Sequence, residues 1–370
     1  MTPTRARISQ SALAANLARA RESAPGCRII AVVKANAYGH GLAPVARALA
    51  RTDAYAVART EEALILREAG LAHPVILLEG PLVAEDLDIA ARFHLDVVIH
   101  SPEQLRMLEL YRGNGRFNLW LKFETGMNRL GMSLAEAPAI LRQLQSLACV
   151  ARPLKLMSHL ACAEERANPM TRTQVSRFLR AFDGLACDHS LANSAGVLAW
   201  PETQAVPDIP GHEGRLSNWV RPGVMLYGIS PFVDETGADH RLTPAMEFET
   251  RLIAIKRVAR GESVGYGAQW RAERESVIGV AAAGYGDGYP RHLGNGTPVR
   301  VGGHVVPLAG RISMDLMTVD LTLHPGARVG DPVTLWGRDL PVETIARRAG
   351  TIGYELVCGI TQRVHMVIED

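Results

Sequence analysis

The sequence predicts an α/β fold: a (β/α)8 barrel of the TIM type, followed by a smaller C-terminal β-rich domain. The chain has 370 residues, which is enough for one barrel and an appendage. Short apolar runs alternate with helical patterns eight times over roughly 230 residues, the number and size of units in such a barrel. Past Pro231 the pattern changes to short β-rich runs between turn residues. We therefore predict two domains, residues 1–235 and residues 236–370.

Eight runs rich in Val, Ile, Leu and Ala predict the barrel strands, because strands of a parallel sheet are buried on both faces. They cover residues 29–33, 53–58, 74–78, 95–99, 118–123, 154–159, 189–192 and 219–226. A doubly wound open sheet is the alternative. It requires a Gly-rich phosphate loop after the first strand, and this chain has none there.

Helical patterns separate these strands. Thr60 is expected to cap a helix that has two glutamates in its first turn, and Ser101 followed by Pro102 marks the start of another. Other helices are expected over residues 42–49, 135–147 and 173–185. In the second domain no long helical pattern separates the β-rich runs, which cover residues 251–258, 276–283, 299–307, 317–323 and 332–336.

Composition narrows the class of protein. A formal net charge of +2 without any block of Lys or Arg gives no reason to expect nucleic acid or membrane binding. The N-terminus lacks the apolar core of a signal peptide, and no run approaches the ~18 apolar residues of a membrane span, so we expect a cytoplasmic protein. The five cysteines contain no Cys-x-x-Cys pair, so neither a disulfide framework nor a metal site is predicted.

Lys34 stands at the end of the first predicted strand, the end that faces the ligand in barrels. A lysine amine can form a Schiff base with an aldehyde cofactor or a carbonyl substrate once its pKa is lowered. The structural alternative is a lysine that extends its charge into water, and the local pattern favours neither. The chain has only four lysines, Lys34, Lys122, Lys155 and Lys256, although a general preference for Arg explains that count equally well.

Residues 31–41 (AVVKANAYGHG) resemble the cofactor-lysine motif of alanine racemases, which bind pyridoxal 5′-phosphate (PLP), and the resemblance extends along nearly the whole chain. It implies a PLP-dependent isomerase that interconverts L-alanine and D-alanine by two-base α-proton exchange on the PLP-bound substrate. D-Alanine biosynthesis for peptidoglycan, or alanine catabolism, would be its role. The resemblance also implies that a strand near Ile8 joins the C-terminal domain.

The resemblance assigns two catalytic bases that act on opposite faces of the substrate. Lys34 holds PLP and is one base. Tyr266, in residues 263–268 (SVGYGA), corresponds to the other. Because a phenol has an ordinary pKa near ~10, we expect a cationic network to lower it, and Arg221 with His159 is the candidate.

The resemblance also assigns the residues that contact the cofactor. Arg221, in residues 220–228 (VRPGVMLYG), corresponds to an arginine that bonds the pyridine nitrogen. A guanidinium does not readily give up its proton, so the ring nitrogen stays unprotonated, which discourages side reactions of the carbanion. The other implied contacts, mostly to the phosphate, are Tyr38, Ser194, Gly223, Val224 and Tyr354.

Residues 121–131 (LKFETGMNRLG) match a second motif of the family. It implies that Arg129 contacts the cofactor phenolic oxygen and the substrate carboxylate, and that Lys122 is a candidate for carbamylation. A cationic neighbour favours neutral lysine, the form that adds carbon dioxide. Met314 corresponds to a residue that offers a backbone amide to the substrate carboxylate. Supporting roles are implied for His159, Tyr285 and Asp315.

The family implies a homodimer in which each active site takes its tyrosine from the partner chain. Three departures from the family pattern, Ser313, Glu164 and His365, remove no catalytic group. The alternatives are a PLP-homeostasis protein, which lacks the β domain and the tyrosine, and a fold-sharing decarboxylase, which is longer and uses another residue on the second face. A broad-specificity racemase is a further alternative.

Overall fold

The computed structural model describes residues 4–204 and 217–370, which form two compact units. The barrel unit comprises Asn16–Ala37 and Leu42–Leu226. The second unit comprises the N-terminal residues as far as Ala15, Tyr38–Gly41 and Tyr227–Asp370. The four residues Tyr38–Gly41 therefore belong to the second unit, although the residues on either side of them belong to the barrel. No helix among the described residues has the length and apolarity needed to cross a bilayer.

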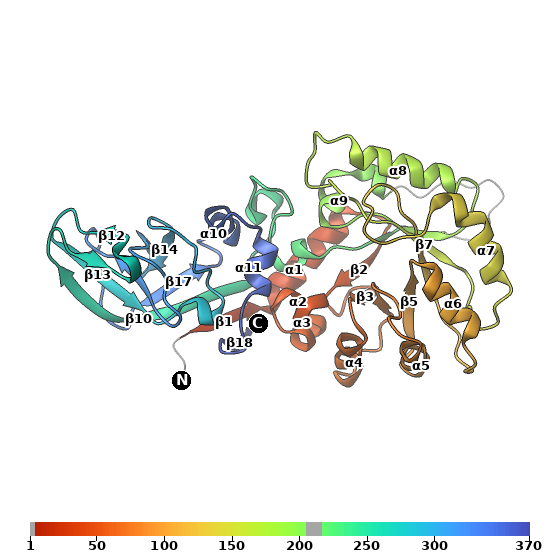
Figure 1. Ribbon diagram of the computed structural model, residues 1–370, viewed down its shortest axis with the longest axis horizontal. Coiled ribbons are helices and arrows are strands. Elements are labelled where there is room, and N and C mark those ends of the chain that lie inside the picture. The colour runs from red at the N-terminus through yellow and green to blue at the C-terminus, as the bar shows by residue number, and fades with distance from the viewer. Residues whose placement is uncertain (1–3, 205–216) are drawn as a thin grey trace. The chain divides into compact units, whose positions relative to one another are not determined.

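The barrel unit contains eight parallel strands, as the sequence predicts (Figure 1). They pair in the order β8-β7-β6-β5-β4-β3-β2-β9. A parallel bridge between His189 and Asn218 then joins the two ends of the sheet and closes the barrel. The strands are β2 Arg28–Val32, β3 Ala54–Val57, β4 Val75–Leu77, β5 Leu95–Ile99, β6 Leu119–Lys122, β7 Lys155–Met157, β8 Asp188–Ser190 and β9 Trp219–Val220.

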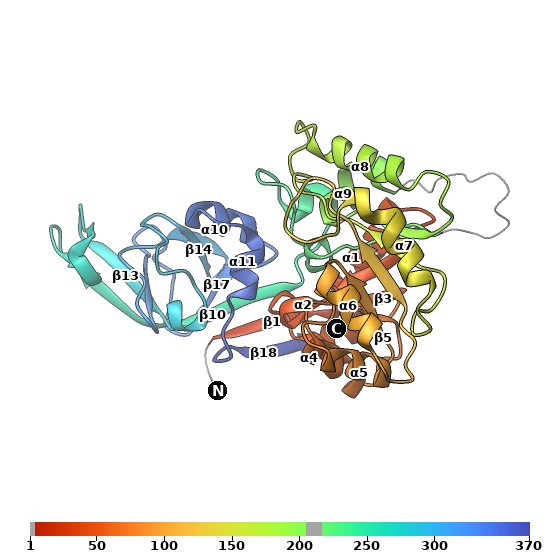
Figure 2. The same cartoon turned by 45° about the vertical axis from the view of Figure 1, so that its right-hand side comes forward.

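Helices surround these strands, and Figure 2 shows α4, α5 and α6 outside β3 and β5. They are α1 Gln10–Ser23, α3 Leu42–Ala48, α4 Thr60–Glu68, α5 Glu85–Arg92, α6 Pro102–Leu110, α7 Ala137–Gln145, α8 Met170–Ala181 and α9 Ser194–Ala199. The prediction at Ser101 is confirmed, because its side chain accepts a hydrogen bond from the Gln104 amide at the start of α6.

Two local predictions were wrong. Thr60 does not cap α4 but is its first residue, and its hydroxyl donates to Asp86 at 3.0 Å instead. The last predicted strand is much shorter than residues 219–226, because Val224–Tyr227 turn into a 3-10 helix. Pro222, which has no amide hydrogen for a sheet, precedes that change.

One end of the barrel core is sealed by aromatic rings. Trp120 and Trp219 meet edge to face with ring centroids 5.7 Å apart, and the Lys155 amine lies 5.1 and 5.5 Å from the two rings. Lys155 also pairs with Asp96 at 3.2 Å. Because Lys155 begins β7, it lies at the amino end of the strands, opposite Lys34. Its positive charge is balanced there by Asp96.

The second unit is built on a mostly antiparallel sheet (Figure 1). Its strands pair in the order β15-β14-β17-β10-β1-β18, with β13 and β16 continuing from β10. The strand expected near Ile8 is β1, Arg5–Ser9, which pairs with β10 and β18. The others are β10 Met246–Val258, β11 Ser263–Val264, β12 Trp270–Arg271, β13 Ser276–Ala281, β14 Pro298–Val301, β15 His304–Pro307, β16 Met317–Asp320, β17 Pro332–Trp336 and β18 His365–Glu369.

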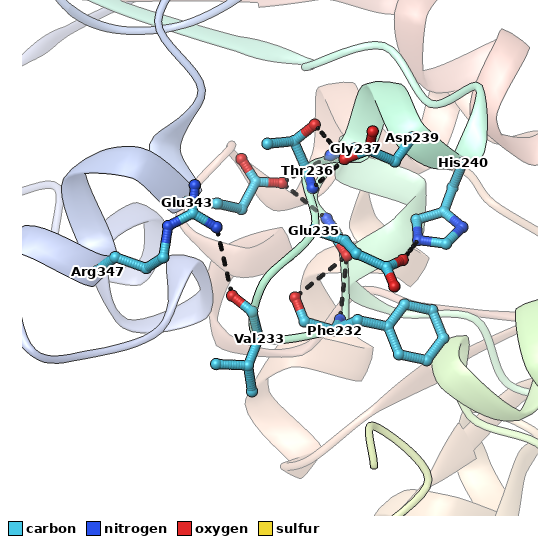
Figure 3. Close-up of polar contacts among 10 residues, drawn as sticks. Phe232, Val233, Glu235, Thr236, Gly237, Asp239, His240, Glu343 and Arg347 are labelled. Carbon is cyan, nitrogen blue, oxygen red and sulfur yellow. Dashed lines mark hydrogen bonds and ion pairs between the residues drawn. The ribbon is translucent and has the colours of Figure 1, made fainter. Parts of the chain in front are cut away.

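Two short helices complete this unit, α10 Val342–Ala349 and α11 Gly353–Cys358. Glu343 in α10 is buried, and its carboxylate accepts hydrogen bonds from the amides of Ser230 and Gly237 at 2.8 and 2.9 Å (Figure 3). Arg347, one turn later, donates to the Val233 carbonyl. These contacts fasten the chain that follows Tyr227 to the helix pair that carries Tyr354.

Candidate functional site

Most of the residues that the sequence predicts for the site lie at or after the carboxyl ends of the barrel strands. Because parallel strands of one barrel end at the same rim, side chains that end or follow these strands share one face of the unit. Lys34 follows β2, Lys122 ends β6, and Arg221 follows β9. The other barrel residues of the predicted site follow β6, β7, β8 or β9, and they are Arg129, His159, Ser194, Gly223 and Val224.

Lys34 opens a left-handed turn. The next four residues, Ala35 to Tyr38, have φ between 52° and 54° although none is glycine. The Ala37 amide donates to the Val33 carbonyl at 2.9 Å, and Asn36 accepts from the first amide of α3 at 2.8 Å. L-residues adopt this conformation at a cost of roughly 1–2 kcal/mol each, and such strain concentrates at functional sites. This left-handed conformation was not predicted from the sequence.

Arg221 is buried and held by neutral acceptors. Its guanidinium donates to the Ser158 carbonyl at 2.6 Å and to the Ser190 hydroxyl, and it also donates to His159 Nδ1 at 3.4 Å. Burial lowers the pKa of Arg221 to about 10, so it remains charged at neutral pH. Desolvation and the positive charges of nearby residues, Arg221 first, hold the pKa of His159 well below 6.5. The imidazole is therefore neutral.

Lys122 is buried among positive charges. Burial, followed by the charges of Arg221, Arg129 and Lys34, lowers the pKa of Lys122 to about 8. A substantial fraction of the amine is then neutral in weakly alkaline solution, as carbamate formation requires. Arg129 itself is exposed, so its guanidinium is accessible from solvent.

Ser194 is the first residue of α9, in a turn capped by Asn193, whose side chain accepts from the Gly196 amide at 2.9 Å. The Ser194 hydroxyl accepts from the amides of Gly223 and Met225 at 2.9 and 3.3 Å. Val224, between them, is buried. The structure thus brings the two predicted phosphate segments into direct contact.

Two predicted cofactor residues lie in the second unit. Tyr38 is buried, stacked on Tyr227 with centroids 4.7 Å apart, and its ring lies 6.1 Å from that of Tyr354. Burial, with a smaller effect of Cys358, raises the pKa of Tyr38, so its hydroxyl keeps its proton. Gly39 follows at φ 78°, and a Cβ there would come within 2.0 Å of the Val357 carbonyl. Residues Tyr38–Gly41 therefore pack closely against α11 within this unit.

Tyr266 is 68% exposed, on a 3-10 turn that follows Gly265. Met314 and Tyr285 are also exposed, and they lie on two loops joined by a hydrogen bond from the Gly286 amide to the Met314 carbonyl at 2.8 Å. Arg363 fastens the loops by donating to Asp315 at 2.6 Å and pairing with Asp287 at 3.5 Å. The second unit therefore presents Tyr266, Tyr285 and Met314 on its surface.

Sequence reasoning missed the residues that support this site. Glu62, expected only to favour a helix dipole, accepts from the amides of Ala35 and Ala58 at 2.6 and 2.9 Å and so holds the turn after Lys34. Glu124 lies inside the quoted second motif, yet no role was predicted for it. An acidic residue two positions before a glycine was the available signal, because such side chains bond backbone amides in turns.

The donors at the barrel rim fit a phosphate-bearing aldehyde. Positive charges predominate, since the neighbours that lower the pKa of Lys122 are all cations and only Glu124 opposes them. A primary amine, a serine hydroxyl and a buried guanidinium are the groups needed for a Schiff base, a phosphate and a ring nitrogen. In PLP binding Lys34 would hold the aldehyde carbon, Ser194 the phosphate and Arg221 the pyridine.

Comparison with known proteins identifies the family. Residues 8–231 match the model described as "Alanine racemase, N-terminal domain", and residues 245–368 match "Alanine racemase, C-terminal domain". Alanine racemase of Shewanella loihica is 47% identical over 365 residues, 99% of both chains, and that of Aeromonas hydrophila is 48% identical over 363 residues, 98% of both.

Solved structures agree. The biosynthetic alanine racemase of Pseudomonas aeruginosa superposes with a TM-score of 0.93 at 44% identity, covering 100% of both chains. The alanine racemase of Acinetobacter baumannii gives 0.90 at 34% identity, again over 100% of both. These full-length matches exclude two alternatives for the class of protein, the shorter PLP-homeostasis protein and the decarboxylase. The chain belongs to the alanine racemase family of PLP-dependent isomerases.

Proposed function

We propose that this chain interconverts L-alanine and D-alanine by exchanging the α-proton between two bases, with PLP held by Lys34. The observation that carries this proposal is the cationic rim of the barrel: Lys34, Lys122 and Arg221 end or follow parallel strands there, and the charges of Arg221, Arg129 and Lys34 act on the buried Lys122 amine. When bound, PLP withdraws electrons from the substrate α-carbon and makes its proton removable. D-Alanine formed in this way would supply peptidoglycan synthesis, or the reaction would serve alanine catabolism.

The residues at the barrel rim bind different groups of the substrate and cofactor. Arg129 is an exposed guanidinium, suited to the substrate carboxylate. Arg221 presents a group that donates and does not accept, so the pyridine nitrogen beside it stays unprotonated. Lys122, as a carbamate, would place an anion beside Arg129 and offset the excess of positive charge.

Proton transfer requires a base on each face of the substrate. The Lys34 amine takes or gives the proton on one face, and the Tyr266 hydroxyl acts on the other. His159 accepts from Arg221 at Nδ1 and, being neutral, carries its proton on Nε2. This tautomer can donate onward to the tyrosine and transmit the charge of Arg221.

We propose further that the working form is a homodimer with shared sites. A second copy would cover Tyr266, Tyr285 and Met314, which are all exposed in the single chain. In a two-fold dimer both sites are completed in the same way. Each site would then combine Lys34 of one chain with Tyr266 of the other.

The test is racemisation of L-alanine in heavy water by the purified chain with PLP. We expect D-alanine to appear carrying deuterium at the α-carbon, together with a visible absorbance from PLP bound to Lys34. Lys34→Ala should abolish both signals. Absence of D-alanine from a protein that carries PLP would refute the proposed activity.

A further inference from the structure

The loop that carries Arg129 is closed at its base by the backbone. The Glu124 amide donates to the Met132 carbonyl, and the Met132 amide donates to the Lys122 carbonyl, both at 2.9 Å. Gly131, at φ 140°, lies so close that a Cβ would come within 2.7 Å of the Glu124 nitrogen. Lys122 and Arg129 are thus the base and the far side of one short loop.

Glu124 fills the inside of this loop with its carboxylate. Oε1 accepts from the amides of Gly126 and Met127, the latter at 2.6 Å, and Oε2 accepts from the Asn128 amide at 2.7 Å. Hydrogen bonds to an ionised acceptor are roughly twice as strong as neutral ones. Three successive amides immediately before Arg129 are therefore fixed by one side chain.

The first part of the loop has a separate anchor. The Thr125 hydroxyl bonds Ser158 at 2.8 Å and accepts from Gln174 at 3.1 Å, and Arg177 donates to the Thr125 carbonyl at 3.1 Å. Within the described part of the chain, Glu124 is the one residue whose side chain forms hydrogen bonds with residues 126–128. The position of Arg129 thus depends on Glu124 beyond the point where Thr125 is fixed.

The same contacts keep Glu124 away from Arg129. The two residues have opposite charges and are five positions apart, yet the oxygens of Glu124 are directed to the backbone amides. Arg129 remains exposed, and it forms no ion pair within the described part of the chain. A carboxylate that neutralised Arg129 would compete with the substrate.

We propose that Glu124 is a positioning residue for substrate binding: it builds the loop 126–128 and holds the Arg129 guanidinium in place for the substrate carboxylate without pairing with it. This inference rests on the proposed function, because Arg129 is assigned there to the carboxylate of alanine. It predicts an effect on the KM for alanine rather than on the chemical step.

The test uses the full chain with PLP and three variants. Glu124→Gln keeps the size of the side chain, but its amide group would face a backbone donor. Glu124→Asp keeps the charge. Its shorter side chain can still reach the amides of Gly126 and Met127, as Asp does in turns, but not the amide of Asn128. Glu68→Gln, an exposed residue of α4, is the control for loss of one negative charge. Kinetics with alanine and amide hydrogen exchange of residues 125–130 are measured for each.

We expect Glu124→Gln to raise the KM for alanine by about tenfold or more, with kcat within about threefold, and to lose protection at amides 126–128. Glu124→Asp should raise KM less and lose amide protection mainly at Asn128. This second variant keeps the test decisive if Glu124→Gln does not fold. Glu68→Gln should match the wild type.

An unchanged KM in Glu124→Gln, with or without loss of amide protection, would overturn the positioning role. A fall in kcat at constant KM would also overturn it, because the residue would then act on the chemical step. If the wild-type chain fails to racemise alanine, the proposed function falls instead, and the exchange data alone decide whether Glu124 builds the loop.

Discussion

Arg221 Nη2 lies 3.4 Å from His159 Nδ1 while the same nitrogen donates to the Ser158 carbonyl at 2.6 Å. A guanidinium can only donate, so Nδ1 is the acceptor and the proton of the neutral imidazole is on Nε2. Desolvation and the cations around it keep the pKa of His159 well below 6.5. His159 is therefore uncharged at neutral pH although it lies against the charged Arg221.

This relationship predicts how stability depends on pH. Unfolded His159 binds a proton as the pH falls below about 6.5, whereas folded His159 resists protonation, so the folded state loses stability in that range. In His159→Gln this loss is removed. We expect a smaller decrease in the free energy of unfolding between about pH 7.5 and pH 5.5 in the variant than in the wild type. Equal decreases in denaturant titrations of both proteins would contradict it.

Lys122 should form a carbamate in weakly alkaline solution. Its pKa of about 8 makes the neutral amine abundant there, and a carbamate would relieve the excess of positive charge around it. With 13C-labelled bicarbonate near pH 8, we expect a carbamate carbon resonance in the wild type. It should vanish in Lys122→Met and persist in the control Lys256→Met. A resonance that survives in Lys122→Met would place the carbamate elsewhere.

Because the turn after Lys34 is left-handed, we expect a glycine substitution in it to stabilise the fold. Ala35 is exposed at φ 54°, so Ala35→Gly removes strain without leaving a cavity. We expect the free energy of unfolding to rise by up to about 1 kcal/mol. The matched substitution Ala18→Gly, at an exposed position in the middle of α1, should lower it by about 0.5–1 kcal/mol. Destabilisation of similar size in both variants would show that the turn is not strained.

Periodicity was sufficient to predict the barrel, because each strand is a compact apolar run and parallel strands are buried on both faces. Leu95–Ile99 was predicted to the residue. The end of the last strand was missed where Pro222 and a 3-10 turn interrupt an apolar run. The helices α10 and α11 were missed because each is short, at 8 and 6 residues, and lies between β-rich segments.

Motifs could nominate the candidate catalytic side chains, but they could not identify the residues that support them. Glu62 and Glu124 bind backbone amides of loops that become visible only when the chain is folded. The left-handed conformation at Ala35 and Ala37 was also hidden, since alanine ordinarily favours the right-handed helix. Motifs suggest which residues react, whereas the conformation of the turns beside them depends on contacts that are distant in sequence.

We propose that Lys34 of one chain and Tyr266 of another form one racemase site. The variants Lys34→Ala and Tyr266→Phe should each be inactive, since each removes one base from every site. When the two are unfolded together and refolded, half the dimers are mixed under random pairing. A mixed dimer has one site with both substitutions and one with neither, so about a quarter of wild-type activity should return.

The measurement is the racemisation rate of the co-refolded mixture relative to co-refolded wild type, with the fraction of mixed dimers determined by differential tagging. With shared sites we expect recovery near a quarter, and no recovery when either variant is refolded alone. A mixture that stays inactive although mixed dimers are present would show that both bases come from one chain and would overturn the shared-site proposal.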